Sequence, residues 1–349
     1  MRTGPVALAY LNDPDGLVEA AMRISALTHH EDLAQQACAV WCLAIRHTVL
    51  NGELPDFDAI AEHAPNTHFW RQVFKQAEES SPYEFTTNGW AIGALQAAWS
   101  AISNTPIKHG SLANQHLVDA LTTVIRIGHD TDTTAAIAGQ LLGARWGASS
   151  VPARWRQVLH GWPGQGSDDL ERLGALITTG GRPLVHGWPL VDSIDYSTYG
   201  PPTLVSDPYD DGVYLGSAPQ LASLPQDVDA VVSLCLVGKT QIPERVDWVG
   251  FRLVDSSSPI ENPQLDSVLR DIAKTIHALR ARGQVVFVHC VRAESRTPTA
   301  ALAYAIWLGH DLGGAERDLR KVLPDAAPNP AFRQALARLA VTTNKPKPE

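Results

Sequence analysis

The chain of 349 residues has only four cysteines, no long apolar run and fewer basic than acidic residues (28 against 37). Four cysteines are too few for a disulfide framework at this length, which favours a reducing location such as the cytoplasm. No apolar run reaches the roughly 18 residues of a membrane-spanning helix, so we expect no membrane partner. A formal net charge of −9 leaves no basic footprint for a nucleic-acid partner.

What is present is an ordinary globular composition, with 44% hydrophobic and 19% charged residues, at a length that suggests two domains. Residues 1–178 repeat apolar residues at three- and four-residue spacing, with few alternating β-branched runs. This pattern predicts an all-α N-terminal domain. Residues 179–205 are rich in Gly, Pro, Ser and Asp, which predicts a linker. Within it, Trp188 and Tyr196 are expected to dock on one of the domains.

Residues 206–345 combine short apolar runs with helical segments. The strand-like runs are residues 212–218, 229–236, 248–255 and 284–290. Their alternation with helices predicts an α/β domain, a three-layer fold with a mainly parallel central sheet. Cys235, within the second run, is expected to be a core residue. Asn329 followed by Pro330 is typical of a helix N-cap and first turn.

The stretch "VVFVHCVRAESRTPT" ends the last strand-like run at Cys290 and places Arg296 one loop later. Loops at the carboxyl ends of parallel strands bind ligands in α/β proteins, and their backbone N–H groups can surround an anion. Such surroundings favour a thiolate at Cys290, and the planar guanidinium of Arg296 matches phosphate oxygens. Thr297 can donate a hydrogen bond to the Cys290 sulfur. The pattern suits phosphoryl transfer through a covalent thiophosphate.

The remaining residues of this loop are expected to line the bound phosphate, and they are His289, Val291, Arg292, Ala293, Glu294 and Ser295. His289 is expected to orient the loop by hydrogen bonding. Ala293 stands where glycine's freedom is often needed, and its methyl group predicts local backbone strain. Glu294 brings a negative charge close to the phosphate position.

This Cys-x5-Arg-Thr loop resembles the dual-specificity branch of the cysteine protein tyrosine phosphatases. "GVYLGSAPQLASL" resembles the opening strand of that family, and "GAERDLRKVLPDAAPNPAFRQAL" resembles its closing helices. The resemblance covers residues 206–345 and implies a phosphatase that needs no cofactor. The expected substrates are a phosphotyrosine or phosphoserine/threonine protein or a small phosphate ester.

A general acid is needed to protonate the leaving oxygen of the substrate. Asp255, at the end of the strand-like run 248–255, stands where the family carries its acid. Asp266 and Asp247 are the competing candidates. Asp266 falls within a helical pattern and Asp247 precedes a strand, so a solvent-facing role explains both more simply.

A second cluster, "GHDTDTT", places Asp130, Asp132 and Thr133 at the start of a helix. Dense oxygen donors suit Mg²⁺ or another hard divalent ion. Helix capping by Asp and Thr explains the same residues equally well. The spacing alone leaves both interpretations open.

The longer stretch "GHDTDTTAAIAGQLLGARWGASSVPARWRQVLHG" resembles the second metal motif of the ADP-ribosylglycohydrolase family, and the resemblance covers residues 1–178. It implies that Asp130, Asp132 and Thr133 belong to a binuclear magnesium centre that acts on ADP-ribosylated substrates. The Thr-Asp-Asp-Thr motif that completes this centre is not found upstream, and Met1-Arg2 resembles the end of another family motif. We therefore expect the C-terminal half of such a domain, fused to a phosphatase.

Two alternative functions stay open beside the phosphatase. One is a magnesium-dependent hydrolase of ADP-ribosyl links that is incomplete in this chain. The other is a catalytically weak adaptor that binds phosphate or ADP-ribose.

Overall fold

The structure, a computed structural model, describes residues 1–343. Contacts divide the chain into two compact units. The first unit comprises Met1–Val151 and Leu173–Arg182, and the second comprises Pro152–Arg172 and the chain from Pro183 onward. This division differs from a boundary at residue 178, because residues 152–172 pack with the second unit. The last two residues of the predicted domain 206–345 lie outside the described residues.

In the described chain, the first unit contains helices as its regular elements. They are α1 (Gly4–Ala9), α2 (Pro14–Ala26), α3 (Asp32–Asn51), α4 (Thr67–Glu79), α5 (Ala91–Asn104), α6 (Gln115–Ile127), α7 (Thr131–Trp146) and the end of α9 (Ser167–Thr178), with 3-10 turns η1 (Asp58–Ile60), η2 (Pro82–Glu84) and η3 (Ala148–Ser150). The helical N-terminal region predicted from the spacing is confirmed. Helix α5 is buried along nearly its whole length, because small and apolar residues occupy every face of it. Trp99 on this helix packs against Trp41 and Phe74.

The second unit is organised around a five-stranded sheet in the order β3-β4-β7-β5-β6. The strands are β3 (Leu204–Ser206), β4 (Val213–Ser217), β5 (Ala230–Ser233), β6 (Asp247–Gly250) and β7 (Val286–Cys290). Each of the four strand-like runs overlaps one of them, and β6 begins one residue before the run 248–255 and ends at Gly250. The pairings β4–β7, β7–β5 and β5–β6 are parallel, whereas β3 pairs antiparallel with β4. The sheet is therefore mixed, with an antiparallel edge strand on a parallel centre.

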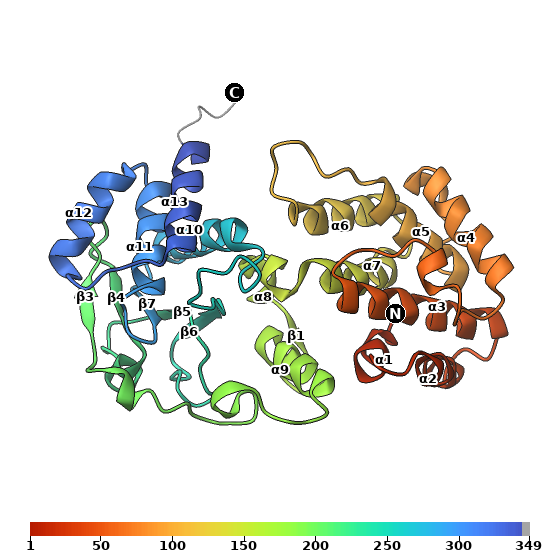
Figure 1. Ribbon diagram of the computed structural model, residues 1–349, viewed down its shortest axis with the longest axis horizontal. Helices are drawn as coiled ribbons and strands as arrows, with labels where there is room; N and C mark the ends of the chain where they lie inside the picture. The colour runs from red at the N-terminus through yellow and green to blue at the C-terminus, as the bar shows by residue number, and fades with distance from the viewer. Residues whose placement is uncertain (344–349) are drawn as a thin grey trace. The chain divides into compact units, whose positions relative to one another are not determined.

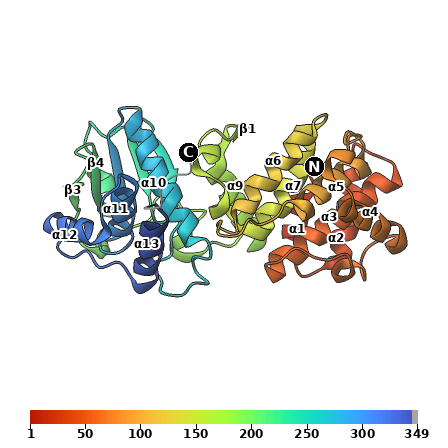
Figure 2. The same cartoon turned by 90° about the horizontal axis from the view of Figure 1, so that it is seen from above.

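The central strands are buried on both faces of the sheet. Every residue of β5 and β7 is buried, which explains why both read as continuous apolar runs and not as alternating ones. Helices α10 (Leu265–Ala281), α11 (Arg296–Trp307) and α13 (Pro330–Thr343) share one hydrophobic core with these strands, and α12 (Leu312–Val322) packs beside them (Figure 1; Figure 2). A smaller apolar cluster contains Leu221 of η6 (Ala218–Ser223) and Phe287 of β7.

The segment before β3 is more ordered than a linker. Residues 152–172 include α8 (Ala153–Arg156), a short antiparallel hairpin β1 (His160–Gly161) and β2 (Gln165–Gly166), and the start of α9 (Ser167–Thr178). The predicted linker contains η4 (Val185–Gly187), η5 (Ser197–Tyr199) and most of β3. Trp188 and Tyr196 are buried, which confirms their expected docking. No helix within residues 1–343 has the length and apolar character to cross a membrane.

Candidate active site

Cys290 is the last residue of β7, the middle strand of the sheet, and it is buried. The chain then turns through residues 291–295 into α11, whose first residue is Arg296. The loop therefore lies at the carboxyl end of a parallel strand and at the positive N-terminal end of a helix. Both features attract anions. The structure thus gives the Cys-x5-Arg segment the strand–loop–helix context that the sequence predicted.

Ala293 adopts a left-handed backbone with φ of 61° and is buried. A non-glycine residue in this region costs about 1–2 kcal/mol, because its Cβ crowds the following carbonyl oxygen. The strain predicted at this position is confirmed. Beside it, Arg292 and Glu294 form an ion pair of 3.1 Å on the loop surface, so part of the negative charge of Glu294 is balanced locally.

Arg296 contacts the chain that follows β5 and the chain that follows β6. Its Nη1 donates to the carbonyl oxygens of Leu253 at 3.0 Å and Leu234 at 3.4 Å. Its Nε lies 3.8 Å from Asp255 Oδ2 and has no hydrogen-bond partner among the described residues. A part-buried guanidinium whose buried Nε lacks a partner among the described residues is suited to a phosphate oxygen.

Asp255 is held against the loop by two hydrogen bonds to the same carboxylate oxygen. Oδ1 accepts from Ser295 Oγ at 2.7 Å and from Asn329 Nδ2 at 2.9 Å. Asn329 also caps α13 as predicted, since its Oδ1 accepts from the N–H of Phe332 at 3.0 Å. The structure therefore brings Asp255 to the Cys290 loop. It places Asp266 in α10, where Asp266 pairs with Arg338.

His289 is buried directly beneath the loop. Its Nε2 lies 2.7 Å from Ser233 Oγ, which also accepts from the indole N–H of Trp248 at 3.0 Å. Burial lowers the pKa of His289 to about 3, although a hydrogen bond with the backbone of Cys290 opposes the shift. A neutral imidazole locked between β5 and β7 fits an orienting role.

Thr297 is buried, and its hydroxyl donates to the carbonyl oxygen of Gly216 in β4 at 3.1 Å. In this arrangement the side chain ties the start of α11 to the sheet. A hydrogen bond from Thr297 to the Cys290 sulfur would require the hydroxyl to turn away from Gly216.

A cavity of about 530 Å³ opens over the loop. Cys290, Asp255 and Arg296 lie in its wall. Aromatic residues that the sequence reasoning did not assign to the site also line it, and they are His186, Tyr196 and Tyr199. These rings form edge contacts with one another, and the Tyr196 hydroxyl donates to the carbonyl oxygen of Leu236 at 2.6 Å.

Cys235 also lines this cavity. Cys235 lies two residues after the end of β5 and is buried, as expected of a core residue. Burial raises the pKa of its thiol to about 12. Its position near Cys290 could not be read from local spacing, because 55 residues separate the two cysteines in the sequence. A thiol with so high a pKa is held protonated at neutral pH.

The aspartate cluster lies in the first unit, at the start of α7. Asp130 and Thr133 line a separate cavity of about 680 Å³, together with Trp41, Asn88 and Trp90 among others. The backbone N–H of Asp130 donates to Asn88 Oδ1 at 3.0 Å. Asp132 is exposed and is not part of the cavity wall.

This donor set does not fit a magnesium centre as it stands. Mg²⁺ requires near-octahedral oxygen coordination, and within residues 1–343 no three His, Cys, Asp or Glu side chains gather closely enough to hold an ion. The cavity wall includes the carboxylates of Glu31, Asp32 and Asp130 and the hydroxyl of Thr133, while Asp132 lies outside it. The metal site predicted at Asp130, Asp132 and Thr133 therefore stays a prediction, for which the described residues supply only part of a coordination shell.

Residues 1–183 match the model of the ADP-ribosylglycohydrolase family, which is more than half of the 349 residues. The chain therefore belongs to the ADP-ribosylglycohydrolase family, and the predicted resemblance of residues 1–178 is confirmed. It is similar to the ADP-ribosyl-(dinitrogen reductase) glycohydrolase of Rhodospirillum rubrum, with 25% identity over 159 residues, covering 46% of this chain and 49% of that protein.

A second similarity is to the human protein phosphatase Slingshot homolog 3, with 32% identity over 129 residues that cover 36% of this chain and 19% of that protein. Among solved structures, the crystal structure of human DUSP28 is 25% identical and covers 42% of this chain and 98% of its own, with a TM-score of 0.37. The chain spans about half or less of the length of the curated relatives it matches. Its relatives thus include hydrolases of two kinds.

Proposed function

We propose that the second unit is a cysteine-dependent phosphatase that hydrolyses phosphate monoesters. The observation that carries the proposal is the convergence of Cys290, Asp255 and Arg296 on one cavity. These residues come from β7, from the chain after β6 and from α11. A nucleophile, an acid and an anion-binding guanidinium in one cavity are the groups that phosphoryl transfer requires. The similarity to a protein phosphatase supports the same proposal.

In the proposed first step, the Cys290 thiolate attacks phosphorus and the bond to the leaving oxygen breaks. Asp255 gives its proton to that oxygen, and Arg296 pairs with two equatorial phosphoryl oxygens. In the second step, water attacks the thiophosphate, Asp255 accepts the water proton, and Cys290 leaves as thiolate. The products are inorganic phosphate and an alcohol or phenol, and no metal or other cofactor enters the reaction.

The test is turnover of p-nitrophenyl phosphate by the full chain, with excess EDTA and with Mg²⁺. Equal rates under both conditions, abolished by Cys290→Ser, are the expected result. Turnover that requires a metal, or that survives Cys290→Ser, would contradict the proposal. Because the nucleophile must be reduced, we also propose a reducing compartment such as the cytoplasm.

The proposed substrate class comprises phosphotyrosine or phosphoserine/threonine proteins and small phosphate esters. The aromatic lining by Tyr196, Tyr199 and His186 favours an aryl phosphate, because edge-to-face ring contacts add to the binding of an aromatic leaving group. Parallel assays on phosphotyrosine and phosphoserine peptides of the same sequence would rank these substrates.

A second candidate function concerns the first unit, which we propose binds an ADP-ribosyl group. The cavity at Asp130 and Thr133 supports it, since Trp41 and Trp90 add aromatic surface to the polar groups of the wall. A relative of this chain is an ADP-ribosyl-(dinitrogen reductase) glycohydrolase. Calorimetric titration of the full chain with ADP-ribose tests binding, and Asp130→Ala should abolish the heat if this cavity is the site.

A further inference from the structure

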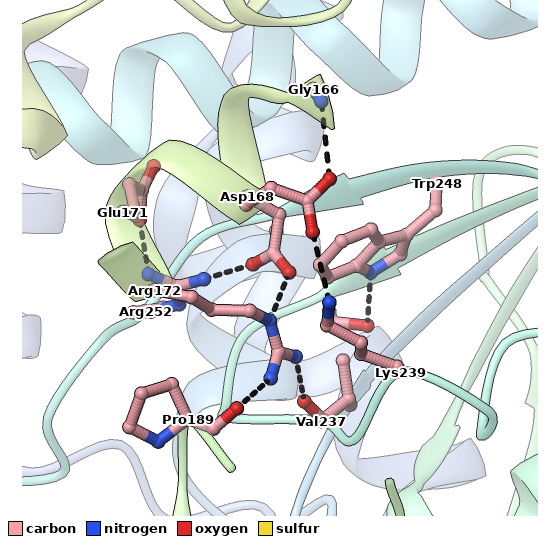
Figure 3. A network of polar contacts seen from close by, with 12 residues as sticks. Gly166, Asp168, Glu171, Arg172, Pro189, Val237, Lys239, Trp248 and Arg252 are labelled. Carbon is pink, nitrogen blue, oxygen red and sulfur yellow. Dashed lines mark hydrogen bonds and ion pairs between the residues drawn. The ribbon is translucent and has the colours of Figure 1, made fainter. Parts of the chain in front are cut away.

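The ion-pair network at the start of α9 lies against the chain that leads to Asp255. The guanidinium of Arg252 pairs with Asp168 through one nitrogen and with Glu171 through another (Figure 3). Asp168 and Glu171 stand three apart on α9, on the same side of the helix. They lie within the ADP-ribosylglycohydrolase match, yet they belong to the second unit together with Arg252.

Arg172 anchors the same helix turn. This arginine is buried, pairs with Asp168, and donates to the carbonyl oxygens of Pro189 and Val237, both at 2.9 Å (Figure 3). The Trp188 ring lies 4.4 Å from the guanidinium carbon of Arg252. A buried arginine whose donors are satisfied in three directions keeps Asp168 in place, because its displacement would leave a charge unpaired.

Arg252 precedes Asp255 by three residues, and the chain between them has little freedom to move. On one side, Arg156 Nη1 donates to the carbonyl oxygen of Gly250 at 2.7 Å. On the other side, Arg296 Nη1 donates to the carbonyl oxygen of Leu253 at 3.0 Å. The segment 250–253 is thus held both by the phosphate-binding arginine and by residues of the segment 152–172.

We propose that Asp168 and Glu171 are positioning residues for the phosphatase reaction, which hold Asp255 at the proton-transfer distance by clamping Arg252. The inference rests on the proposed function of Cys290. A carboxyl that transfers a proton must lie within hydrogen-bond reach of the leaving oxygen, and displacement by about 1 Å can cost up to roughly 10²-fold in rate. Arg252 lines the cavity that holds Cys290, whereas Asp168 and Glu171 do not. We therefore expect the two carboxylates to act on the reaction indirectly, and to matter most when the leaving group needs a proton.

The test compares phenyl phosphate, which has a poor leaving group, with p-nitrophenyl phosphate, which has a good one. Glu171→Gln in the full chain should lower kcat on phenyl phosphate by about tenfold or more, with kcat on p-nitrophenyl phosphate changed by less than about twofold. Arg252→Lys keeps one charge but cannot pair with both carboxylates. Because Arg252 also lines the cavity, this variant is judged by the ratio of kcat on phenyl phosphate to kcat on p-nitrophenyl phosphate, which should fall. If Glu171→Gln does not fold, the Arg252→Lys variant tests the positioning role in its place.

The matched control is Lys239→Ala, which removes the 3.1 Å pair with Asp169 on the same helix. It should leave the ratio of the two rates unchanged. In an Asp255→Asn background, Glu171→Gln should cause no further loss on phenyl phosphate, since a double-mutant cycle reports coupling between residues that act as one.

The outcomes separate this inference from the function on which it rests. A wild-type chain without Cys290-dependent hydrolysis would overturn both. A Cys290-dependent enzyme that Glu171→Gln slows equally on both substrates, or slows further in the Asp255→Asn background, would overturn the positioning role alone.

Discussion

The Cys290 loop and the Asp130 cluster are both short sequence motifs, but they differ in how many distant residues the fold brings to them. The Cys290 loop gathers partners from distant segments, among them Asp255 and Asn329. At the aspartate cluster, Asp130 and Thr133 line a cavity while Asp132 is exposed. Successive helical residues point about 100° apart, so residues three apart share a face and residues two apart do not. A short motif becomes a site when other elements complete it.

The largest change in rate should come from removing the proposed nucleophile of the Cys290 site. Cys290→Ser should lower kcat on p-nitrophenyl phosphate by about 10⁴-fold or more, because the remaining groups stabilise charge but form no covalent intermediate. Binding of vanadate should persist, since the loop backbone and Arg296 are unchanged. Steady-state kinetics and vanadate titration measure the two quantities, and joint loss of both would indicate a misfolded variant.

The effect of replacing Asp255 on kcat should depend on the leaving group of the substrate. Asp255→Asn should lower kcat on phenyl phosphate by at least about 10²-fold, as expected for loss of a general acid, and should affect p-nitrophenyl phosphate much less. An equal loss on both substrates would mean that Asp255 serves the loop through Ser295 and Asn329 and transfers no proton.

His289 should make the second unit sensitive to acid. Its folded pKa of about 3 lies below the roughly 6.5 of an unfolded histidine, so the unfolded chain takes up a proton that the folded chain does not. The contribution of neutral His289 to the free energy of unfolding is therefore fully present above about pH 6.5. It is lost as the pH falls toward 3, by an amount on the order of a few kcal/mol. Urea unfolding at several pH values measures it.

The comparison variant for that experiment is His289→Gln, whose amide can still reach Ser233. Other groups titrate in the same range, so the quantity to follow is the difference in the free energy of unfolding between the two proteins. This difference should shrink as the pH falls from 6.5. A constant difference across the range would refute the assignment.

A smaller effect should follow from the aromatic lining. Tyr199→Leu should lower kcat/KM for a phosphotyrosine peptide by about 2- to 10-fold, the range that one ring contact of 0.5–1.5 kcal/mol allows. The same variant should leave kcat/KM for the matching phosphoserine peptide unchanged. If both substrates lose equally, the ring supports the cavity and does not select the substrate.

The smallest effect is expected at the Asp130 cluster. Because the described donor set falls short of a magnesium centre, the chain should release no ADP-ribose from ADP-ribosyl-arginine peptides in millimolar Mg²⁺. Asp132→Ala should alter neither this result nor the phosphatase rate. Release of ADP-ribose that Asp132→Ala abolishes would show that ligands reach the cluster from elsewhere.

Much of the local structure could be predicted from the sequence. Helical spacing identified the helical first unit, and apolar runs identified β4, β5, β6 and β7. The position of Cys290 between a strand and a helix, the strain at Ala293 and the cap at Asn329 were also predicted correctly. These features depend on residues within a few positions of one another, where periodicity, steric preference and capping chemistry act directly.

Only the tertiary structure decided which distant residues serve the site. Residues of the predicted linker formed β3 and the aromatic wall of the Cys290 cavity. Asn329 gained a second role at Asp255, and Arg252 found its carboxylate partners in α9, more than 80 positions earlier in the chain. No local pattern encodes such pairs, because their energies arise when burial brings charged groups together and each must find a partner in the folded chain.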